Sequence, residues 1–228
     1  MNFLSLFKRS LIYRFKKKIN IDKDGIKEKS LDDLFFHYGS DKSDIFKKLK
    51  DKGHGYSNFY TSHLKHLKHN EIKILEIGSF SGASAAAFKK FFFKSSIFCF
   101  DINISKFIYS SKNIHVYGLD VNNKRDLKKC LEIIRTKTHS NKFDVIIDDG
   151  SHNLSDLILS LKNLFEYVKS GGFYIIEDFK FPNYYEYNRN IDHIFMDEIF
   201  HNLNKKNFFK SSILKKEDQI YFHENISK

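Results

Sequence analysis

Residues 145–149 read Val-Ile-Ile-Asp-Asp and continue as Gly-Ser-His at 150–152, and residues 173–178 read Phe-Tyr-Ile-Ile-Glu-Asp. Such short apolar runs are typical of strands buried in a parallel sheet. The segment between them, Leu154 to Lys169, has the length of one helix and is closed by Gly171-Gly172. The pattern predicts a β-α-β unit whose strands end at one carboxyl edge of a sheet, where open α/β folds bind ligands.

A pair of adjacent acids ends each of these strands, Asp148-Asp149 on the first and Glu177-Asp178 on the second, and His152 follows the first pair. Oxygen ligands suit a hard divalent cation, and an imidazole beside them suits proton transfer. A single acid would be explained as a cap of the following helix, whereas two pairs favour a functional site. Asp148 alternates away from Asp149, so it is expected to face a cofactor or the helix layer.

The composition indicates one sizeable core. The chain has 228 residues, 41% of them hydrophobic and 16% aromatic, which is ample for a globular domain. No apolar stretch reaches the roughly 18 residues of a membrane span. Cys99 and Cys130 form no CxxC pair, so a reducing, cytoplasmic compartment is the simplest expectation.

A net charge of +11 raises the possibility of a nucleic-acid partner. The lysines, however, are spread along the whole chain, and abundant Lys, Asn, Ile and Phe with one Pro and no Trp is a pattern expected from A+T-rich codons. The composition therefore disfavours nucleic acid as the partner.

The one dense basic run lies in residues 1–19. Apolar residues recur there every four positions, at Phe3, Phe7, Leu11, Phe15 and Ile19. Basic residues occupy the other faces of the expected helix: Lys8, Arg9, Arg14, Lys16, Lys17 and Lys18. This pattern predicts a basic amphipathic helix that contacts an anionic membrane surface, such as the inner face of the cytoplasmic membrane, or else packs on the body of the protein or frays. Residues 1–30 are thus expected to be this segment and a polar linker, and residues 31–70 a lid segment.

Within the lid segment, Tyr60 to His69 is expected to be helical, with three histidines on a solvated face. From residue 71 strands and helices alternate. Strands are expected at 72–77, 97–100 and 114–117, and helices at 84–93, 104–110, 124–138 and 191–203. Alternating residues at 207–214 and 219–223 predict a C-terminal antiparallel β-hairpin. The expected fold is α/β, with a doubly wound, mostly parallel sheet.

The loop after the first of these strands reads Glu76-Ile77-Gly78-Ser79-Phe80-Ser81-Gly82. Its glycines let the backbone turn tightly and approach a ligand closely. The spacing is not that of the dinucleotide fingerprint, so a nucleotide-sized ligand without a pyrophosphate is expected. Asp101 ends the next strand and is placed to accept hydrogen bonds from ribose hydroxyls. Asp120 follows the third strand, where an acid is able to meet a base amino group.

These motifs resemble the class I S-adenosylmethionine-dependent methyltransferases over roughly residues 72–224. The acidic edge, together with Tyr38-Gly39-Ser40-Asp41-Lys42 and His54-Gly55-Tyr56 upstream, is similar to the metal-dependent macrocin and mycinamicin type of sugar O-methyltransferases. The resemblance implies a Rossmann-like fold, S-adenosyl-L-methionine and Mg²⁺ as cofactors, and a methyltransferase domain at 71–228. It further implies Asp149, Glu177 and Asp178 as metal ligands and His152 as the general base. The implied cofactor-binding residues are Glu76, Gly78, Ser79, Gly82, Asp101, Asp120 and Asp148.

The expected activity is O-methylation of a hydroxyl on a sugar, glycan or polyol-like small molecule, by a monomer or a homo-oligomer. Two alternatives stay open at this point. The first is an RNA methyltransferase, in which the positive charge would bind the phosphates of the RNA. This alternative does not explain the acidic cluster. A non-catalytic cofactor-fold module tethered by the basic N-terminal helix would tolerate neutralisation of that cluster.

Overall fold

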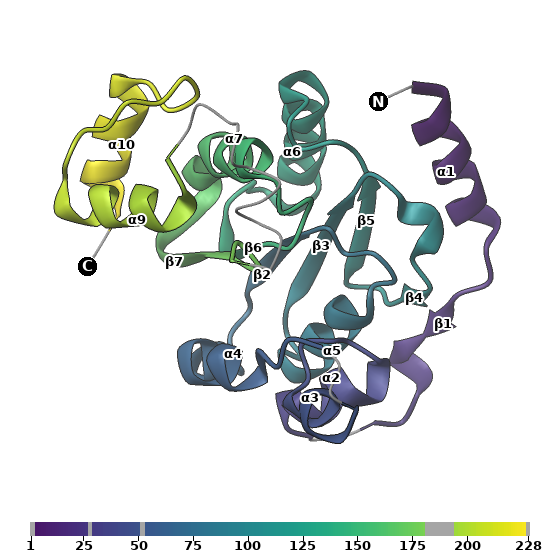
Figure 1. Ribbon diagram of the computed structural model, residues 1–228. Helices are drawn as coiled ribbons and strands as arrows, with labels where there is room; N and C mark the ends of the chain where they lie inside the picture. Colours follow the sequence, from purple (N-terminus) through teal and green to yellow (C-terminus); the bar gives the residue numbers. More distant parts are fainter. Residues whose placement is uncertain (1–2, 27–28, 51–52, 181–193, 227–228) are drawn as a thin grey trace. The chain divides into compact units, whose positions relative to one another are not determined.

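The computed structural model describes residues 3–26, 29–50, 53–180 and 194–226. The chain divides into two compact units, Met1–Asp120 and Val121–Lys228, which we call the N-terminal and C-terminal units. Both units contain helices and parallel strands (Figure 1).

Three parallel strands form the sheet of the N-terminal unit, in the order β5-β3-β2. They are β2 (Lys73–Ile77), β3 (Ser96–Asp101) and β5 (Ile114–Gly118). Ile74, Leu75 and Phe98 are buried on them, which accounts for the apolar residues that predominate in these segments. The three predicted strands are confirmed.

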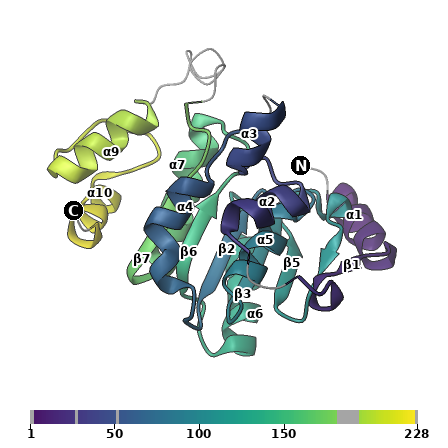
Figure 2. The ribbon, with the colours of Figure 1, turned by 90° about the horizontal axis from the view of Figure 1, so that it is seen from below.

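Helices α2 (Leu31–Tyr38), α3 (Asp44–Lys50), α4 (Ser57–Leu64) and α5 (Ala83–Phe91) belong to the same unit, and η2 (Lys65–Leu67) follows α4. The predicted lid segment is therefore largely helical, and α2 packs against α5 (Figure 2). An aromatic cluster holds them together: Phe35 and Tyr60 both meet Phe88 edge-on, with ring centroids 5.2 and 5.1 Å away.

Helix α1 (Phe3–Phe15) lies beside the 3₁₀ turn η3 (Ile104–Lys106), as Figure 1 shows. The helix expected at 104–110 is wrong beyond this turn, because Tyr109–Ser110 forms strand β4 and pairs in parallel with β1 (Ile19–Asn20). The expected linker at 20–30 also contains structure, the turn η1 (Ile21–Lys23). The side chain of Ile21 is fully buried, which anchors this turn.

The C-terminal unit begins with α6 (Lys124–Thr138), as predicted, followed by β6 (Phe143–Asp148) and α7 (Leu154–Leu164). After the turn η4 (Phe165–Tyr167), strand β7 (Val168–Ile176) pairs in parallel with β6. The predicted β-α-β unit is confirmed, but its helix is shorter than expected. Gly171 and Gly172 lie within β7, where a Cβ on Gly172 would stand 2.7 Å from the Asp144 carbonyl oxygen.

The predicted C-terminal hairpin is wrong. Its second segment is helix α10 (Lys216–Asn225), preceded by α9 (Met196–Lys205). The predicted helix at 191–203 agrees with α9 in part, and Ile191 to His193 lie outside the described residues. Gln219, Phe222 and His223 are buried at helical spacing, so the alternation at 219–223 conceals a 3.6-residue period.

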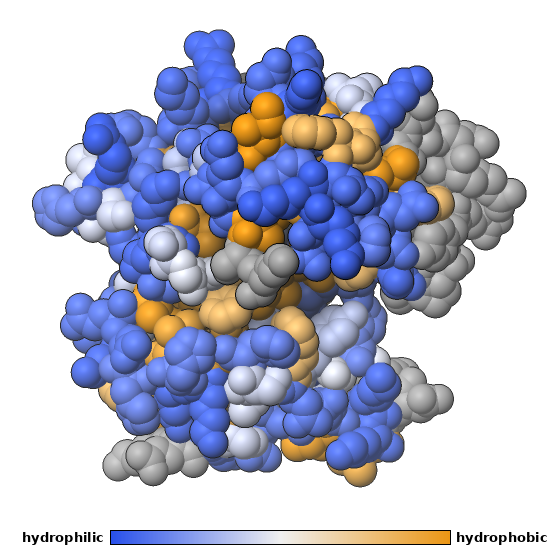
Figure 3. Space-filling view, turned by 90° about the vertical axis from the view of Figure 1, so that its left-hand side faces the viewer, coloured by the Kyte–Doolittle hydropathy of each residue, from blue (hydrophilic) through white to orange (hydrophobic). Residues whose placement is uncertain are grey.

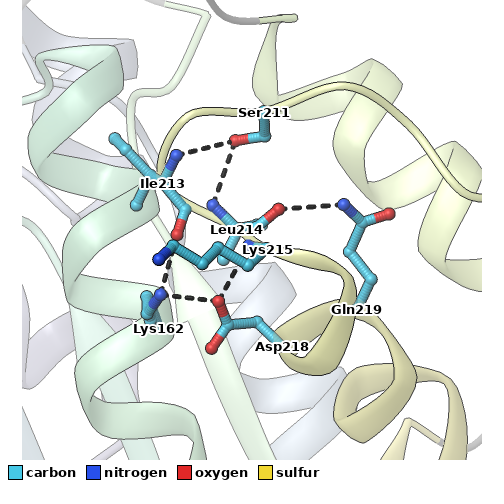
Figure 4. Close-up of polar contacts among 7 residues, drawn as sticks. All are labelled: Lys162, Ser211, Ile213, Leu214, Lys215, Asp218 and Gln219. Atoms are coloured by element: carbon cyan, nitrogen blue, oxygen red, sulfur yellow. Dashed lines mark hydrogen bonds and ion pairs between the residues drawn. The ribbon is translucent and has the colours of Figure 1, made fainter.

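Side-chain hydrogen bonds hold α10 and the preceding segment in place (Figure 4). The Asp218 carboxylate accepts from the Lys215 backbone N–H at 2.8 Å and from Lys162 Nζ of α7 at 2.5 Å. The Gln219 amide donates to the carbonyls of Phe209 and Leu214, each at 2.9 Å. These bonds occupy backbone groups that a hairpin would have used in its ladder.

The core of the C-terminal unit joins α7, α9 and α10 through buried residues such as Leu157, Ile199 and Phe222. The surface in Figure 3 is largely hydrophilic, with separate patches of hydrophobic side chains. Within the described ranges, the helices are all too short or too polar to span a bilayer. Cys99 and Cys130 are buried free thiols.

Candidate functional site

The glycine loop follows β2 at the carboxyl edge of the N-terminal unit. Gly78 and Gly82 both have φ of 80°, a left-handed conformation that side chains with a Cβ rarely adopt. A Cβ at Gly82 would stand 2.3 Å from the Phe107 ring, so the loop has no room for a larger residue there. Ser79 is buried, and its hydroxyl donates to the Glu76 carbonyl at 3.2 Å.

Asp101 ties this loop to the end of β3. One carboxylate oxygen accepts from the Phe80 backbone N–H at 2.8 Å, and the other accepts from the Asn103 N–H at 2.5 Å. A carboxylate has about four acceptor positions, so Asp101 keeps capacity for two ligand hydroxyls while its orientation is held by the backbone.

Phe80 is a residue of this site that the sequence analysis did not single out. Its backbone is left-handed, with φ of 41°, and its side chain is 66% exposed at the cofactor edge. An exposed aromatic ring on a strained backbone is a feature of ligand-binding loops. Only the Gly-Ser-Phe-Ser-Gly spacing could have signalled it.

The two other predicted acids of this edge differ in burial. Glu76 is fully buried on β2, and Asp120 is half-buried two residues beyond Gly118, which pairs with Asp101 in the sheet. Burial, with the nearby Glu76 charge, raises the pKa of the Cys99 thiol. The structure thus brings six of the seven predicted cofactor residues to one edge of the N-terminal unit.

The acidic cluster lies in the C-terminal unit. Asp149, His152 and Asp178 each offer one ligand atom, and these atoms lie within 4.8 Å of one another. All three side chains are half-buried, and His152 Nε2 lies 3.8 Å from an Asp149 carboxylate oxygen. Two carboxylates at a partly open position suit Mg²⁺, which keeps several waters and binds few protein ligands.

Glu177 does not join this group. Its side chain is buried, with 5% exposed, and its backbone N–H donates to the Asp148 carbonyl at 2.9 Å. The next residue, Asp178, has a left-handed backbone with φ of 53°, which turns the chain out of strand geometry. The structure therefore pairs Asp149 with Asp178, where the resemblance implied all three acids.

The loop that carries His152 is held by hydrogen bonds to Asp156 in the first turn of α7. The Ser151 hydroxyl donates to one Asp156 oxygen at 2.5 Å, and the Asn122 amide donates to the other at 2.9 Å. His152 itself has φ of 57°, a strained conformation for a residue with a Cβ. Asp156 is a positioning residue that the sequence analysis missed, although an acid in the first turn of a helix is a common signal.

Asp148 was expected to face either a cofactor or the helix layer. In the structure its side chain is buried against the helix layer. Its carboxylate accepts from the Tyr174 hydroxyl at 3.4 Å and from the Gly150 N–H at 3.3 Å, and the Ser160 hydroxyl of α7 also bonds it. Burial, with a smaller contribution from the Asp149 charge, raises the pKa of Asp148 to about 6. Its bond to the Gly150 N–H thus closes the turn that contains Asp149.

Comparisons with known proteins identify O-methyltransferases as relatives of this chain. Demethylmacrocin O-methyltransferase from Streptomyces fradiae is 30% identical over 132 residues, which are 55% of this chain and 32% of that protein. Mycinamicin VI 2''-O-methyltransferase from Micromonospora griseorubida is 30% identical over 132 residues, 55% of this chain and 31% of that protein. The relatives are macrocin- and mycinamicin-type sugar O-methyltransferases. The matched region spans about a third of their length.

Among solved structures, the MycE methyltransferase from the mycinamycin biosynthetic pathway, in complex with Mg and SAH, has a TM-score of 0.63 at 22% identity. The match covers 79% of this chain and 49% of that one. It confirms the predicted Rossmann-like methyltransferase fold with a mostly parallel sheet. No family model matches the chain.

Proposed function

We propose that this chain is an S-adenosylmethionine-dependent, Mg²⁺-assisted O-methyltransferase that acts on a hydroxyl of a sugar, glycan or polyol-like small molecule. The grouping of Asp149, His152 and Asp178 carries the proposal, because it places two hard oxygen ligands beside a base. The O-methyltransferase names of the relatives support the same chemistry.

In the N-terminal unit, the chain's task is to bind and orient the methyl donor. Asp101 is held by two backbone N–H groups, so its remaining acceptor positions are directed before the ribose arrives. Gly78, Ser79 and Gly82 let the backbone approach, while Glu76 and Asp120 complete the proposed cofactor residues. Orienting reacting atoms in this way can supply roughly 7–11 kcal/mol.

In the C-terminal unit, Asp149 and Asp178 would hold Mg²⁺, and bound Mg²⁺ would lower the pKa of the attacking hydroxyl. The acceptor oxygen then forms a bond to the methyl carbon while the carbon–sulfur bond breaks. We assign His152 to remove the hydroxyl proton. Asp148 is kept as the seventh proposed cofactor residue, and its bond to the Gly150 N–H holds the turn that carries Asp149.

Glu177 remains a proposed third ligand, with a role that differs from that of Asp178. Its side chain is buried next to Asp178 in the sequence, and it would bind the ion only after a side-chain rotation. Asp178 requires no such rotation, so its loss is expected to weaken the metal site more than the loss of Glu177.

We further propose that residues 1–19 bring the protein to an anionic, inner membrane surface. Arg9 donates to the Ile102 carbonyl at 2.8 Å and Lys16 to the Ser105 carbonyl at 3.0 Å, so α1 is packed on its unit along one side. The other side exposes Phe7, Leu11 and Phe15, with 59%, 46% and 78% of each residue accessible. An apolar stripe between basic residues suits an anionic bilayer surface.

One assay tests the proposed activity. The protein is incubated with methyl-labelled S-adenosylmethionine and a panel of glycosides, polyols, phenolics and RNA, with Mg²⁺ or with chelator. We expect label on a glycoside or polyol only when Mg²⁺ is present. Label on RNA, or equal labelling in chelator, would contradict the proposal.

A further inference from the structure

A basic pocket lies at the edge of the N-terminal unit opposite the glycine loop. It has a volume of about 850 Å³, within the range of roughly 300–1,000 Å³ typical of small-molecule sites. Its walls come from the segments that precede the strands: Lys68 and His69 before β2, Phe93 before β3 and Lys112 before β5. β2 has five residues, so this edge is roughly 15 Å from the carboxyl edge where Gly78 follows that strand.

Part of the pocket's positive charge has a structural explanation. Lys89 is buried and donates to the carbonyls of Phe93 and Ser95, at 2.5 and 3.0 Å. Lys90 forms an ion pair with Asp24 at 2.6 Å. Both lysines lie in the last turn of α5, where cations stabilise a helix.

The remaining lysines lack such an explanation. In the ranges that the structure describes, no ion pair joins Lys29, Lys68 or Lys112 to a carboxylate. The one acid in the wall, Asp22, accepts from the Ser111 hydroxyl and the Lys112 N–H at 2.8 and 2.9 Å. The Asp22 charge also interacts with Lys112 and Lys89, but the wall contains five lysines and this single acid, so it keeps an excess of cations.

The lysines that are gathered in this wall repel one another. Burial lowers the pKa of Lys89, the Asp22 charge opposes that shift, and the charges of Lys112 and Lys90 make smaller contributions that lower the pKa further. An anion among these groups would relieve the repulsion and accept several charge-assisted hydrogen bonds.

The aromatic side of the pocket favours one class of anion. Phe93 is 50% exposed and meets the His69 ring edge-on at 5.6 Å, and Lys68 Nζ lies 4.9 Å from the centroid of the Phe91 ring. An exposed ring beside ammonium groups can stack on a flat heterocycle while the lysines bind phosphate.

We propose that this pocket binds a small phosphorylated molecule with a flat ring, of the nucleoside diphosphate class, at a site separate from the one proposed for the methyl donor. The pocket supplies ammonium groups for the phosphates and the Phe93 ring for the heterocycle. Occupancy would connect three segments that precede different strands, so the ligand would also stabilise the unit.

Calorimetry with adenosine diphosphate and with inorganic pyrophosphate tests the proposal. The titrations contain saturating S-adenosylhomocysteine and a chelator, which block binding at the carboxyl edge and through a metal ion. We expect the parent protein to bind adenosine diphosphate more tightly than pyrophosphate. Lys68→Glu/Lys112→Glu should weaken both at least about tenfold, as expected for lost charge-assisted hydrogen bonds.

Lys128→Glu/Lys129→Glu, on the exposed face of α6, makes the same change in net charge and should bind like the parent. Lys68→Gln/Lys112→Gln repeats the test if the charge reversal prevents folding. Phe93→Ala should weaken adenosine diphosphate binding and leave pyrophosphate binding unchanged. No binding by the parent, an equal loss in the α6 control, or no preference for adenosine diphosphate would overturn the proposal.

Discussion

Asp149 and His152 lie side by side, yet their loss should have different consequences. Asp149→Ala removes a proposed metal ligand, so activity should fall and recover in part at high Mg²⁺. His152→Ala leaves both carboxylates of the cluster in place, so metal and S-adenosylhomocysteine binding should persist while kcat falls by about 10²–10⁴-fold. Single-turnover rates and Mg²⁺ titrations of the two variants measure this difference.

The matched control is Asp144→Ala, which removes an acid of the same strand that forms an ion pair with Lys169 at 2.8 Å. It should keep the parent's Mg²⁺ dependence. Unchanged turnover in His152→Ala, or loss of Mg²⁺ binding in that variant alone, would exclude the assigned base.

Asp148 should make stability depend on pH. Its pKa rises from 3.8 to about 6 on folding, so the folded protein favours the protonated carboxyl. This contribution is fully present below pH 3.8 and is lost as pH rises through about 6. The shift corresponds to about 3 kcal/mol, at about 1.4 kcal/mol for each pH unit.

Asp148→Asn cannot ionise, so the free energy of unfolding relative to the parent should increase between pH 4 and 7. Urea unfolding of both proteins in chelator, at several pH values, measures the difference. Parallel curves for parent and variant would show that burial of Asp148 does not favour the protonated carboxyl.

At the scale of single elements, local pattern predicted the strands and α6 well, because a buried parallel strand needs an unbroken apolar run. The pattern did not predict the secondary structure of segments whose conformation is set by tertiary contacts. Residues 104–110 lie under the glycine loop, where Phe107 packs against Gly82, and their backbone pairs with β1. Periodicity within the segment carries no information on either contact.

In the candidate site, too, the sequence predicted the strands that carry the acids but not the backbone geometry that groups their side chains. Parallel strands that end at one edge predicted that acids from β6 and β7 would meet. Sheet register places Asp148 beside Ile176, so regular continuation would have brought Asp149 beside Glu177. The left-handed backbone of Asp178 departs from this geometry, and neither that conformation nor the support from Asp156 can be predicted from alternation alone.

Helix α10 should depend on Asp218. The carboxylate bonds the Lys215 N–H and the Lys162 ammonium group, so Asp218→Ala removes a helix cap and an ion pair together. Capping residues contribute about 0.5–2 kcal/mol, and we expect a loss of about that size in the free energy of unfolding. Glu217→Ala, in the same turn but exposed, should cost less than Asp218→Ala. Equal losses in the two variants would contradict the assigned cap.

For the whole molecule, the proposal of a sugar or polyol acceptor rests on the region that this chain shares with its relatives. The matched region, about a third of the length of each relative, includes 55% of this chain. Charge is a property of the entire surface, and a total of +11 favours approach to any anionic partner.

The proposed membrane contact can be separated from this general attraction. Phe7→Ser/Leu11→Ser/Phe15→Ser leaves every charge and the Arg9 and Lys16 hydrogen bonds in place, so only apolar contact is lost. Burying one such side chain is worth about 1.5–3 kcal/mol, so co-sedimentation with anionic vesicles should fall at least about tenfold. Ile133→Ser/Ile220→Ser removes exposed apolar side chains from α6 and α10 and should bind vesicles like the parent. If the triple variant binds anionic vesicles as well as the parent does, the attraction is purely electrostatic and the stripe on α1 does not enter the bilayer surface.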